Sequence, residues 1–158
     1  MVELLTLEVA GRHYAIPAAC LQEVTRAVAI STLPKAPPII DGVINVRGTI
    51  VPVIDVRQRC GLESRSVTPD QHFVVAHAAN RVVALRVDQA IELLAVEESA
   101  IESAALVAPG SDYVAGIAKL PDGLIVIHDL DRFLSLEESS SLDAALAATP
   151  AALPGWSA

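Results

Sequence analysis

The sequence predicts a mainly β protein, in which two similar small barrels of the SH3-like type pack together and carry short helices. Three observations lead to this fold class. A unit of roughly 70 residues is repeated within the chain, its apolar runs are short and rich in β-branched residues, and Gly or Pro separates these runs. A chain of 158 residues with 53% apolar content can bury a core without disulfides or metals.

The repeat is clearest where the segment GVINVRGTIVPVIDV at Gly42–Val56 returns as GIAKLPDGLIVIHDL at Gly116–Leu130. An earlier pair matches Arg12–Glu23 with Arg81–Glu92. The offset is 69 residues in the earlier pair and 74 in the later one. A period this long indicates two similar modules and excludes a solenoid of short repeats.

Two hairpins are predicted in the first half of the chain. The first joins Glu3–Val9 to His13–Ile16 around Ala10-Gly11-Arg12. The second places the turn Arg47-Gly48 before the strand Thr49–Asp55.

Three segments complete the first half. Pro17 opens a stretch that ends near Val24, which is predicted to be either a helical turn or a strand. Thr32–Pro38 contains three prolines and is predicted to be an extended connector. Pro52 cannot donate a hydrogen bond to a ladder, so its strand is predicted to lie at a sheet edge or at a bulge.

The second half repeats this pattern. A hairpin is predicted from Phe73–Ala78 and Val82–Val87 around Ala79-Asn80. Glu97–Ala105 is polar and Ala-rich, which favours a short helix. A last strand, Leu124–His128, follows a turn-forming Pro-Asp-Gly segment.

Helices are expected after each barrel. Asp55 and Asp129 each follow a strand and are predicted to cap a short helix, with equal contributions to stability. Further helices are predicted over Leu130–Leu136 and over Ser141–Ala148, the latter capped by its first serine. Thr149–Ala158 is predicted to be a frayed tail.

The charge is uneven along the chain. Residues 1–61 carry six Lys/Arg and five Asp/Glu, whereas residues 62–158 carry five and fourteen, for a net charge of −8. Nucleic acid is not an expected partner, because no cationic stripe is present. Arg47, Arg57 and Arg59 gather in the first copy of the repeat, either as a basic patch for an acidic protein partner or, for the last two, as a solvated helix face.

Other compositional features point to a cytoplasmic protein. No apolar run approaches the roughly 20 residues of a membrane span. The N-terminal Met-Val-Glu lacks the basic start of a signal peptide. Cys20 and Cys60 are too few for a disulfide framework, and unpaired buried thiols are the simpler interpretation.

Catalytic signatures are absent from the sequence, which contains no GxSxG, P-loop, GxGxxG or HExxH motif. His128, Asp129 and Asp131 could hold a divalent ion. Cys60 could act as a nucleophile if a base lay close to it. A binding module without a cofactor is therefore favoured, and a small metal- or thiol-dependent enzyme on a β-barrel scaffold is the alternative.

The run Gly42–Asp55, followed by Val-Arg-Gln-Arg-Cys-Gly, resembles the signature of the CheW-like domain, the coupling protein of bacterial chemosensory arrays. Two further segments are similar to motifs of that family. Leu21-Gln22-Glu23-Val24 resembles its V-Q-E-I segment, and the residues from Val87 to Leu93 resemble its V-D-x-x-x-E segment. The resemblance covers residues 3–136.

The resemblance implies two five-stranded β-barrels with a hydrophobic seam between them. It places the first barrel at residues 10–65 and the second at residues 66–130, with an N-terminal strand that both could share. The CheW-like domain would then span residues 1–136, and residues 137–158 would form a C-terminal helix and a flexible tail.

The resemblance also implies a function. The protein would be a non-enzymatic adaptor, located at membrane-bound receptor arrays, that joins the cytoplasmic tip of a methyl-accepting chemoreceptor to the regulatory domain of a CheA-type histidine kinase. The residues that match receptor-binding positions are Leu21, Glu23, Val24 and Arg47. Arg47 could instead be a turn residue that anchors a loop, and Glu23 could have a fold-level role shared with Glu92, its repeat counterpart. Gly42 and Gly48 match positions of structural turns.

Overall fold

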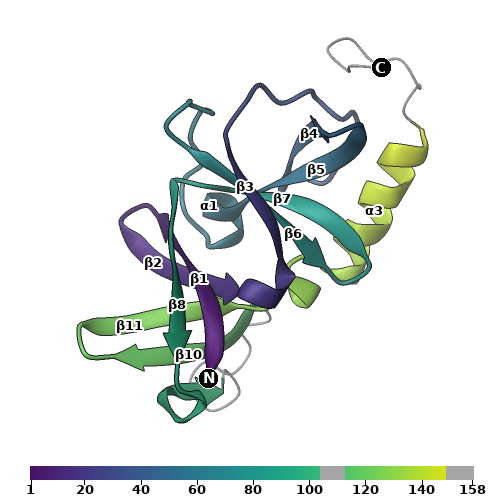
Figure 1. Ribbon diagram of the computed structural model, residues 1–158. Helices are drawn as coiled ribbons and strands as arrows, with labels where there is room; N and C mark the ends of the chain where they lie inside the picture. Colours follow the sequence, from purple (N-terminus) through teal and green to yellow (C-terminus); the bar gives the residue numbers. More distant parts are fainter. Residues whose placement is uncertain (104–112, 149–158) are drawn as a thin grey trace.

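The computed structural model describes residues 1–103 and 113–148, which form two β-sheets with short helices around them (Figure 1). Sheet A consists, in spatial order, of β8 (Gln89–Val96), β1 (Val2–Val9), β2 (Arg12–Pro17), β11 (Gly123–His128), β10 (Val114–Leu120) and β9 (Ile101–Ser103). Sheet B consists of β3 (Leu21–Arg26), β6 (His72–Ala78), β7 (Arg81–Val87), β5 (Thr49–Asp55) and β4 (Ile40–Val46). The mainly β, two-sheet architecture is confirmed. Sheet B has the predicted five strands, whereas sheet A has six, because β9 adds a short strand at its edge.

The helices are short. Within residues 1–103 and 113–148, two are α-helices, α1 (Val56–Arg59) and α3 (Leu136–Ala147). The 3-10 turns are η1 (Ala18–Cys20), η2 (Glu98–Ala100) and η3 (Leu130–Arg132). In Figure 1, α3 runs along the outside of sheet B.

The hairpin turns predicted from sequence are confirmed, and two of them have left-handed backbone at both central residues. Ala10 and Gly11 have φ of 54° and 75°, and Arg47 and Gly48 have φ of 51° and 87°. Positive φ at both central residues is the type I′ turn, whose twist matches that of the flanking strands. Ala79, the repeat counterpart of Ala10, has φ of 55°.

The two halves of the chain exchange strands. β3 of the first half pairs with β6 of the second, and β8 of the second half pairs with β1 of the first. The strands of sheet B lie within residues 21–87, and those of sheet A within residues 2–17 and 89–128. The expected barrel bounds, 10–65 and 66–130, therefore do not match the sheets, because a repeat assigns residues to copies and not to strand partners. In the described residues β1 pairs only with β2 and β8, both of sheet A, so the expected sharing of the N-terminal strand stays a prediction.

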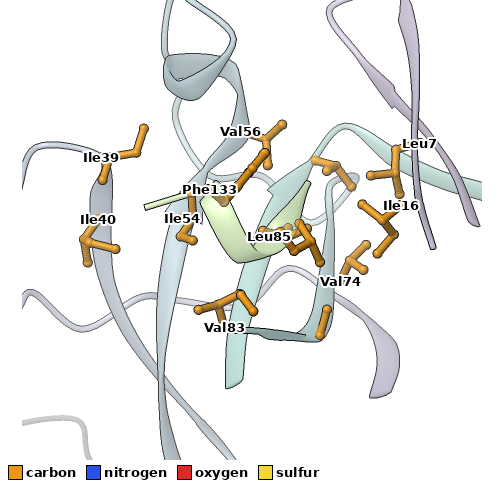
Figure 2. Packing of buried hydrophobic residues seen from close by; sticks show 14 of the residues in the cluster. Leu7, Ile16, Ile39, Ile40, Ile54, Val56, Val74, Val83, Leu85 and Phe133 are labelled. Atoms are coloured by element: carbon orange, nitrogen blue, oxygen red, sulfur yellow. The ribbon is translucent and has the colours of Figure 1, made fainter. Parts of the chain in front are cut away.

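Buried side chains form one cluster inside each sheet and a larger one between the sheets. Alternation along a strand separates these clusters: Phe73 packs inside sheet B, whereas the next residue, Val74, belongs to the cluster between the sheets. Figure 2 shows part of this seam, where Leu7 and Ile16 from sheet A lie near Val74 and Leu85 from sheet B. Both faces of the inner strands are thus buried.

Gly42 is not the turn residue that the family resemblance implied. It lies within β4 at a register shift, with φ of 150°, and a Cβ placed there would be 2.2 Å from the Ser31 carbonyl oxygen. Its repeat counterpart Gly116 lies at the matching register shift in β10, and its Cβ would be 2.7 Å from the Glu102 carbonyl oxygen. Glycine is needed at both positions because a neighbouring backbone segment crosses there.

Pro52 does not mark an edge strand, because β5 is flanked by β4 and β7, but the β4–β5 ladder does contain the alternative, a register shift between Ile40 and Gly42. The pairing of β5 with β7 covers only Val53–Asp55. Pro52 lies just outside this ladder, where its missing N–H removes no hydrogen bond to β7.

The C-terminal helices differ from the prediction. The expected helix over residues 130–136 is the three-residue η3, and the expected helix over Ser141–Ala148 begins earlier, at Leu136. Its cap is Ser135, which accepts a hydrogen bond from Glu138 N while Ser135 N donates to the Glu138 side chain. This capping box satisfies free backbone donors of the first turn, so the start moves to Ser135. The predicted tail, Thr149–Ala158, lies outside the described residues.

The predicted helix over Glu97–Ala105 is also wrong in most of its described part. It is a helical turn only at η2, and β9 follows as an edge strand of sheet A. β9 pairs with β10 at Gly116, where the absent side chain lets the two backbones meet. Tertiary pairing thus overrides the helix propensity of this segment. Ala104 and Ala105 lie outside the described residues.

Candidate functional site

Arg47 occupies the first central position of the β4–β5 turn. Gly48 follows it, and the Gly48 N–H donates to Asn45 Oδ1 at 2.7 Å, which closes the turn. The Arg47 side chain is 84% exposed. A tight turn with a fixed backbone therefore presents a long cation to solvent, where a partner can reach it.

Glu23 lies opposite this turn, on β3. Its Oε2 accepts a hydrogen bond from Arg47 Nη2 at 3.0 Å, and its side chain is 20% exposed. β3 and β4 are the two end strands of sheet B, so this ion pair shows that the sheet curls until its ends come close. An exposed ion pair adds little to folding stability, about 0 to 1 kcal/mol. Its charges remain available for binding.

Leu21 and Val24 have different surroundings on the same strand. Burial alternates along β3, with Leu21 and Glu23 half-buried and Val24 exposed. Leu21 packs against the cluster between the sheets. The structure therefore brings Glu23 and Arg47 together, places Leu21 beside the seam, and leaves Val24 40% exposed on the other side of the strand. Val28, at 56% exposure, extends this apolar surface beyond β3.

A second candidate surface lies on sheet A, at the repeat counterpart of the first. Leu93 corresponds to Val24 and is 55% exposed, and Ile91 on the same strand is 46% exposed. Glu92 corresponds to Glu23, but the counterpart of Arg47 is Pro121, so the closing ion pair has no equivalent. The offset of 69 residues could have identified Leu93 from the sequence.

A groove of about 360 Å³ takes the place of that ion pair. It lies between β8 and the β10–β11 turn and is lined by Thr6, His13, Ile91, Glu92, Leu94, Leu120, Pro121, Asp122, Gly123, Leu124 and Ile125. Leu124 on its rim is 65% exposed. An apolar groove flanked by exposed Leu and Ile is typical of a protein-binding surface.

Charge also distinguishes the two sheets. Residues 21–87, which contain sheet B, carry eight Lys/Arg and five Asp/Glu. Residues 1–17 and 89–128, which contain sheet A, carry two and eight. Partners of the two surfaces should therefore differ in charge.

The basic patch expected around the first repeat copy is not present as predicted. The Arg57 side chain is 10% exposed and pairs with Asp88, and the Arg59 side chain is 6% exposed and pairs with Glu138. Neither is a solvated helix face. Arg59 also stacks over the Tyr113 ring, 4.4 Å from its centroid. Both arginines hold elements of the fold together.

Asp55 and Asp129 cap short helices, as predicted. Asp55 accepts a hydrogen bond from Gln58 N at the start of α1, and Asp129 accepts one from Asp131 N at the start of η3. Their surroundings are not alike. Asp55 is 1% exposed and forms an ion pair with Arg86 at 3.2 Å, whereas the closest cation to Asp129 is the exposed Arg132 at 3.9 Å.

The proposed metal ligands face different neighbours. Asp131 Oδ1 accepts a hydrogen bond from Ala79 N, and the His128 ring packs against Tyr14 and Phe133. No group of three or more His, Cys, Asp or Glu side chains within residues 1–103 and 113–148 has the arrangement of a metal site.

One geometric observation bears on the alternative of a thiol-dependent enzyme. Cys60 Sγ lies 4.0 Å from His128 Nε2, so the chain does bring a cysteine and a histidine together. Burial raises the pKa of the Cys60 thiol, and burial lowers the pKa of His128 to about 4. Both groups are therefore neutral near pH 7, and the pair lacks the thiolate that a nucleophile requires.

Comparison with known proteins identifies relatives along most of the chain. A family model of the CheW-like domain matches residues 3–138. The chemotaxis protein CheW of Bacillus subtilis is 31% identical over 141 residues, which cover 88% of this chain and 90% of that protein. The chemotaxis protein CheW of Klebsiella aerogenes is 27% identical over 143 residues, which cover 89% and 86%.

The fold has a counterpart among solved structures. The crystal structure of the scaffolding protein TtCheW from Thermoanaerobacter tengcongensis matches with a TM-score of 0.79 and 29% sequence identity. The match covers 87% of this chain and 94% of that one. None of the helices within residues 1–103 and 113–148 has the length and apolar character to cross a membrane.

Proposed function

This chain belongs to the CheW-like domain family, and on that premise we propose that it is a chemotaxis adaptor without catalytic activity. It couples the cytoplasmic tip of a methyl-accepting chemoreceptor to the regulatory domain of a CheA-type histidine kinase. It acts in the cytoplasm, beside membrane-bound receptor arrays, and requires no cofactor. The names of its relatives, chemotaxis and scaffolding proteins, support this class of function.

The single observation that carries the proposal is the difference between two corresponding sites. In sheet B the gap between the end strands is closed by Glu23 and Arg47, which leaves an exposed charge pair. In sheet A the corresponding gap is open and apolar. An adaptor needs two surfaces of different chemistry, and a duplicated module that has diverged at one site supplies them.

We assign the receptor to the polar site. Arg47 can exchange its bond with Glu23 for charge-assisted hydrogen bonds to a partner carboxylate or carbonyl group. Leu21, on the same side of β3 as Glu23, adds an apolar contact beside the ion pair, and Val24 adds an exposed one on the opposite side of the strand.

We assign the kinase domain to the apolar groove of sheet A. Ile91 and Leu124 are exposed there, and Leu93 is exposed beside the groove on β8. Burying such side chains contributes about 25 cal/mol for each Å² removed from water. Glu92 and Asp122 at the groove favour a partner whose rim is basic.

Binding measurements with each partner separately test these assignments. Arg47→Glu should reduce affinity for the receptor tip by a hundredfold or more, because a repelled, buried charge costs several kcal/mol, and should leave kinase-domain binding unchanged. Leu93→Glu should have the opposite pattern. Arg132→Glu and Leu136→Glu are matched controls, because their side chains are also exposed but lie away from both sites. Normal receptor binding by a folded Arg47→Glu protein would remove Arg47 from the site.

A further inference from the structure

The strands change sheet twice within the described residues, and the two crossings differ in length. From β2 to β3 the chain passes through the three residues of η1. From β7 to β8 it passes through one residue, Asp88. The second crossing is therefore the shorter link between the sheets, and Asp88 forms it.

The Asp88 side chain ties elements of both sheets together at this crossing. Its Oδ1 and Oδ2 accept hydrogen bonds from Arg57 Nε at 3.1 Å and Arg57 Nη2 at 2.6 Å. Oδ2 also accepts one from Ala10 N at 2.8 Å, and Asp88 N donates to the Glu8 carbonyl at 3.0 Å. Arg57 belongs to α1, which follows β5 of sheet B, whereas Ala10 lies in the β1–β2 turn of sheet A.

The corresponding contact at the first crossing is weaker. Ala79, the repeat counterpart of Ala10, donates its N–H to Asp131 Oδ1 at 2.8 Å. We call the hydrogen bonds that Asp88 accepts from Arg57 and Ala10 the clasp. In the corresponding contact, Asp131 itself occupies the position of Arg57, so a carboxylate bonds a turn there without an arginine. Among the ion pairs of the described residues, none involves Asp131.

Apolar packing between the sheets constrains their angle less sharply than directional polar bonds do, and a hydrogen bond from Ala90 N of β8 to His72 Nδ1 of β6, at 2.9 Å, also links the two sheets. The cluster between the sheets is built from aliphatic and aromatic side chains, and the hydrophobic effect has no directional preference. A bidentate arginine–carboxylate pair does have one, because its two parallel hydrogen bonds require coplanar groups. The Arg57 side chain is 10% exposed and that of Asp88 is 21% exposed, so solvent competes little for these bonds.

Asp88 is charged near pH 7. Burial by itself would raise the pKa of Asp88, but the hydrogen bonds from Arg57 and Ala10 N outweigh this effect and lower the pKa. The clasp therefore keeps its ionic form under the conditions in which the protein works.

We infer that Asp88, acting through Arg57 and the Ala10 N–H, is the positioning residue that sets the angle between the two sheets. The angle fixes where the β3 surface lies relative to the β8 groove. This second step rests on the proposed function, whereas the angle itself does not.

Residual dipolar couplings of backbone amides, measured on nitrogen-15-labelled protein, test the angle without attaching a probe to the chain. In the wild type, the amides of sheet A and sheet B should fit one alignment tensor, as parts of one rigid body. In Asp88→Asn they should need two tensors that differ in orientation or magnitude when fitted to the wild-type arrangement, because the amide cannot accept both Arg57 hydrogen bonds. Asp131→Asn is the matched control and should behave as the wild type. If Asp88→Asn only destabilised the fold, its melting temperature would fall but both sheets would still fit one tensor.

A common tensor in well-folded Asp88→Asn would overturn the inference. Should that variant fail to fold, Arg57→Lys keeps the charge, loses the bidentate geometry and is expected to separate the tensors in the same way. A single tensor in Arg57→Lys would then count against the inference.

A binding experiment connects the angle to the adaptor role. Asp88→Asn should bind the receptor tip and the kinase domain singly within about twofold of wild type, whereas its affinity for the second partner in the presence of the first should fall about tenfold. Equal ternary affinity in both proteins would overturn the link from angle to function. Failure of the wild type to bind both partners would contradict the proposed function, and the dipolar couplings would still decide the inference about the angle.

Discussion

Removing the Asp55 carboxylate should destabilise the protein far more than removing its repeat counterpart Asp129. Asp55 caps α1, accepts a hydrogen bond from the Ser64 hydroxyl and pairs with Arg86 at 3.2 Å. Asp55→Ala would leave Arg86, whose side chain is 4% exposed, without one of its two carboxylates. Asp41 would remain as the other, with its Oδ2 2.8 Å from Arg86 Nε.

The magnitude follows from these contacts. Breaking a buried ion pair costs about 3–5 kcal/mol, and losing a helix cap costs about 0.5–2 kcal/mol. Asp41 reduces the first cost because it still pairs with Arg86. We therefore expect Asp55→Ala to cost about 3 kcal/mol, and Asp129→Ala, which loses a cap at the half-buried start of η3, about 0.5–1 kcal/mol.

Urea unfolding curves of the two variants measure this difference directly. Both should retain the wild-type slope, so that the shift in midpoint reports stability alone. In thermal melts the Asp55→Ala change should lower Tm by about 6–12 °C, given about 2–4 °C per kcal/mol at this chain length. Equal costs for the two variants would refute the argument from burial and would favour a role limited to capping.

Two further predictions concern glycine and acid. Gly42→Ala should lower the free energy of unfolding by more than about 2 kcal/mol, because its Cβ would lie 2.2 Å from a backbone oxygen. Gly48→Ala has open space around it and φ of 87°, so it should lower the free energy of unfolding by about 1 kcal/mol. Chemical denaturation compares the pair, and a smaller cost at Gly42 would contradict the close approach. Because the pKa of His128 is lowered to about 4, the unfolded chain binds a proton that the folded chain excludes, so stability should fall by up to about 3 kcal/mol as pH drops from 6.5 to 4. Urea midpoints across this range should fall less in His128→Phe than in the exposed-residue control His77→Gln, and parallel profiles would rule out His128 as the cause.

Local sequence patterns predicted much of the fold. Both repeat copies, their hairpins and the Arg47-Gly48 turn were readable from β-branched runs and turn residues, because those signals act over a few residues. The exchange of β3 and β8 between the halves was not readable, since strand partners far apart in sequence leave no local signal. The same limit applied to Gly42, whose role depends on Ser31 crossing above it.

The candidate site was predictable only in part. The family resemblance selected Glu23 and Arg47, and the structure pairs them, but the sequence could not show that Val24 lies on the exposed side of β3. It also suggested a basic patch at Arg57 and Arg59, because charge counts do not reveal burial. The groove of sheet A was not predicted. Its main sequence signal is that Pro121, the repeat counterpart of Arg47, carries no charge, and a missing charge is not a motif.

Co-sedimentation of the kinase regulatory domain with vesicles that display the chemoreceptor tip tests the central claim most directly. If the chain has two surfaces for two partners, the kinase domain should sediment only when the chain is added. The bridge should be lost with either Arg47→Glu or Leu93→Glu and retained with Leu136→Glu. If the kinase domain instead displaces the chain from the vesicles, the two partners compete for one surface, and the two-surface account is contradicted.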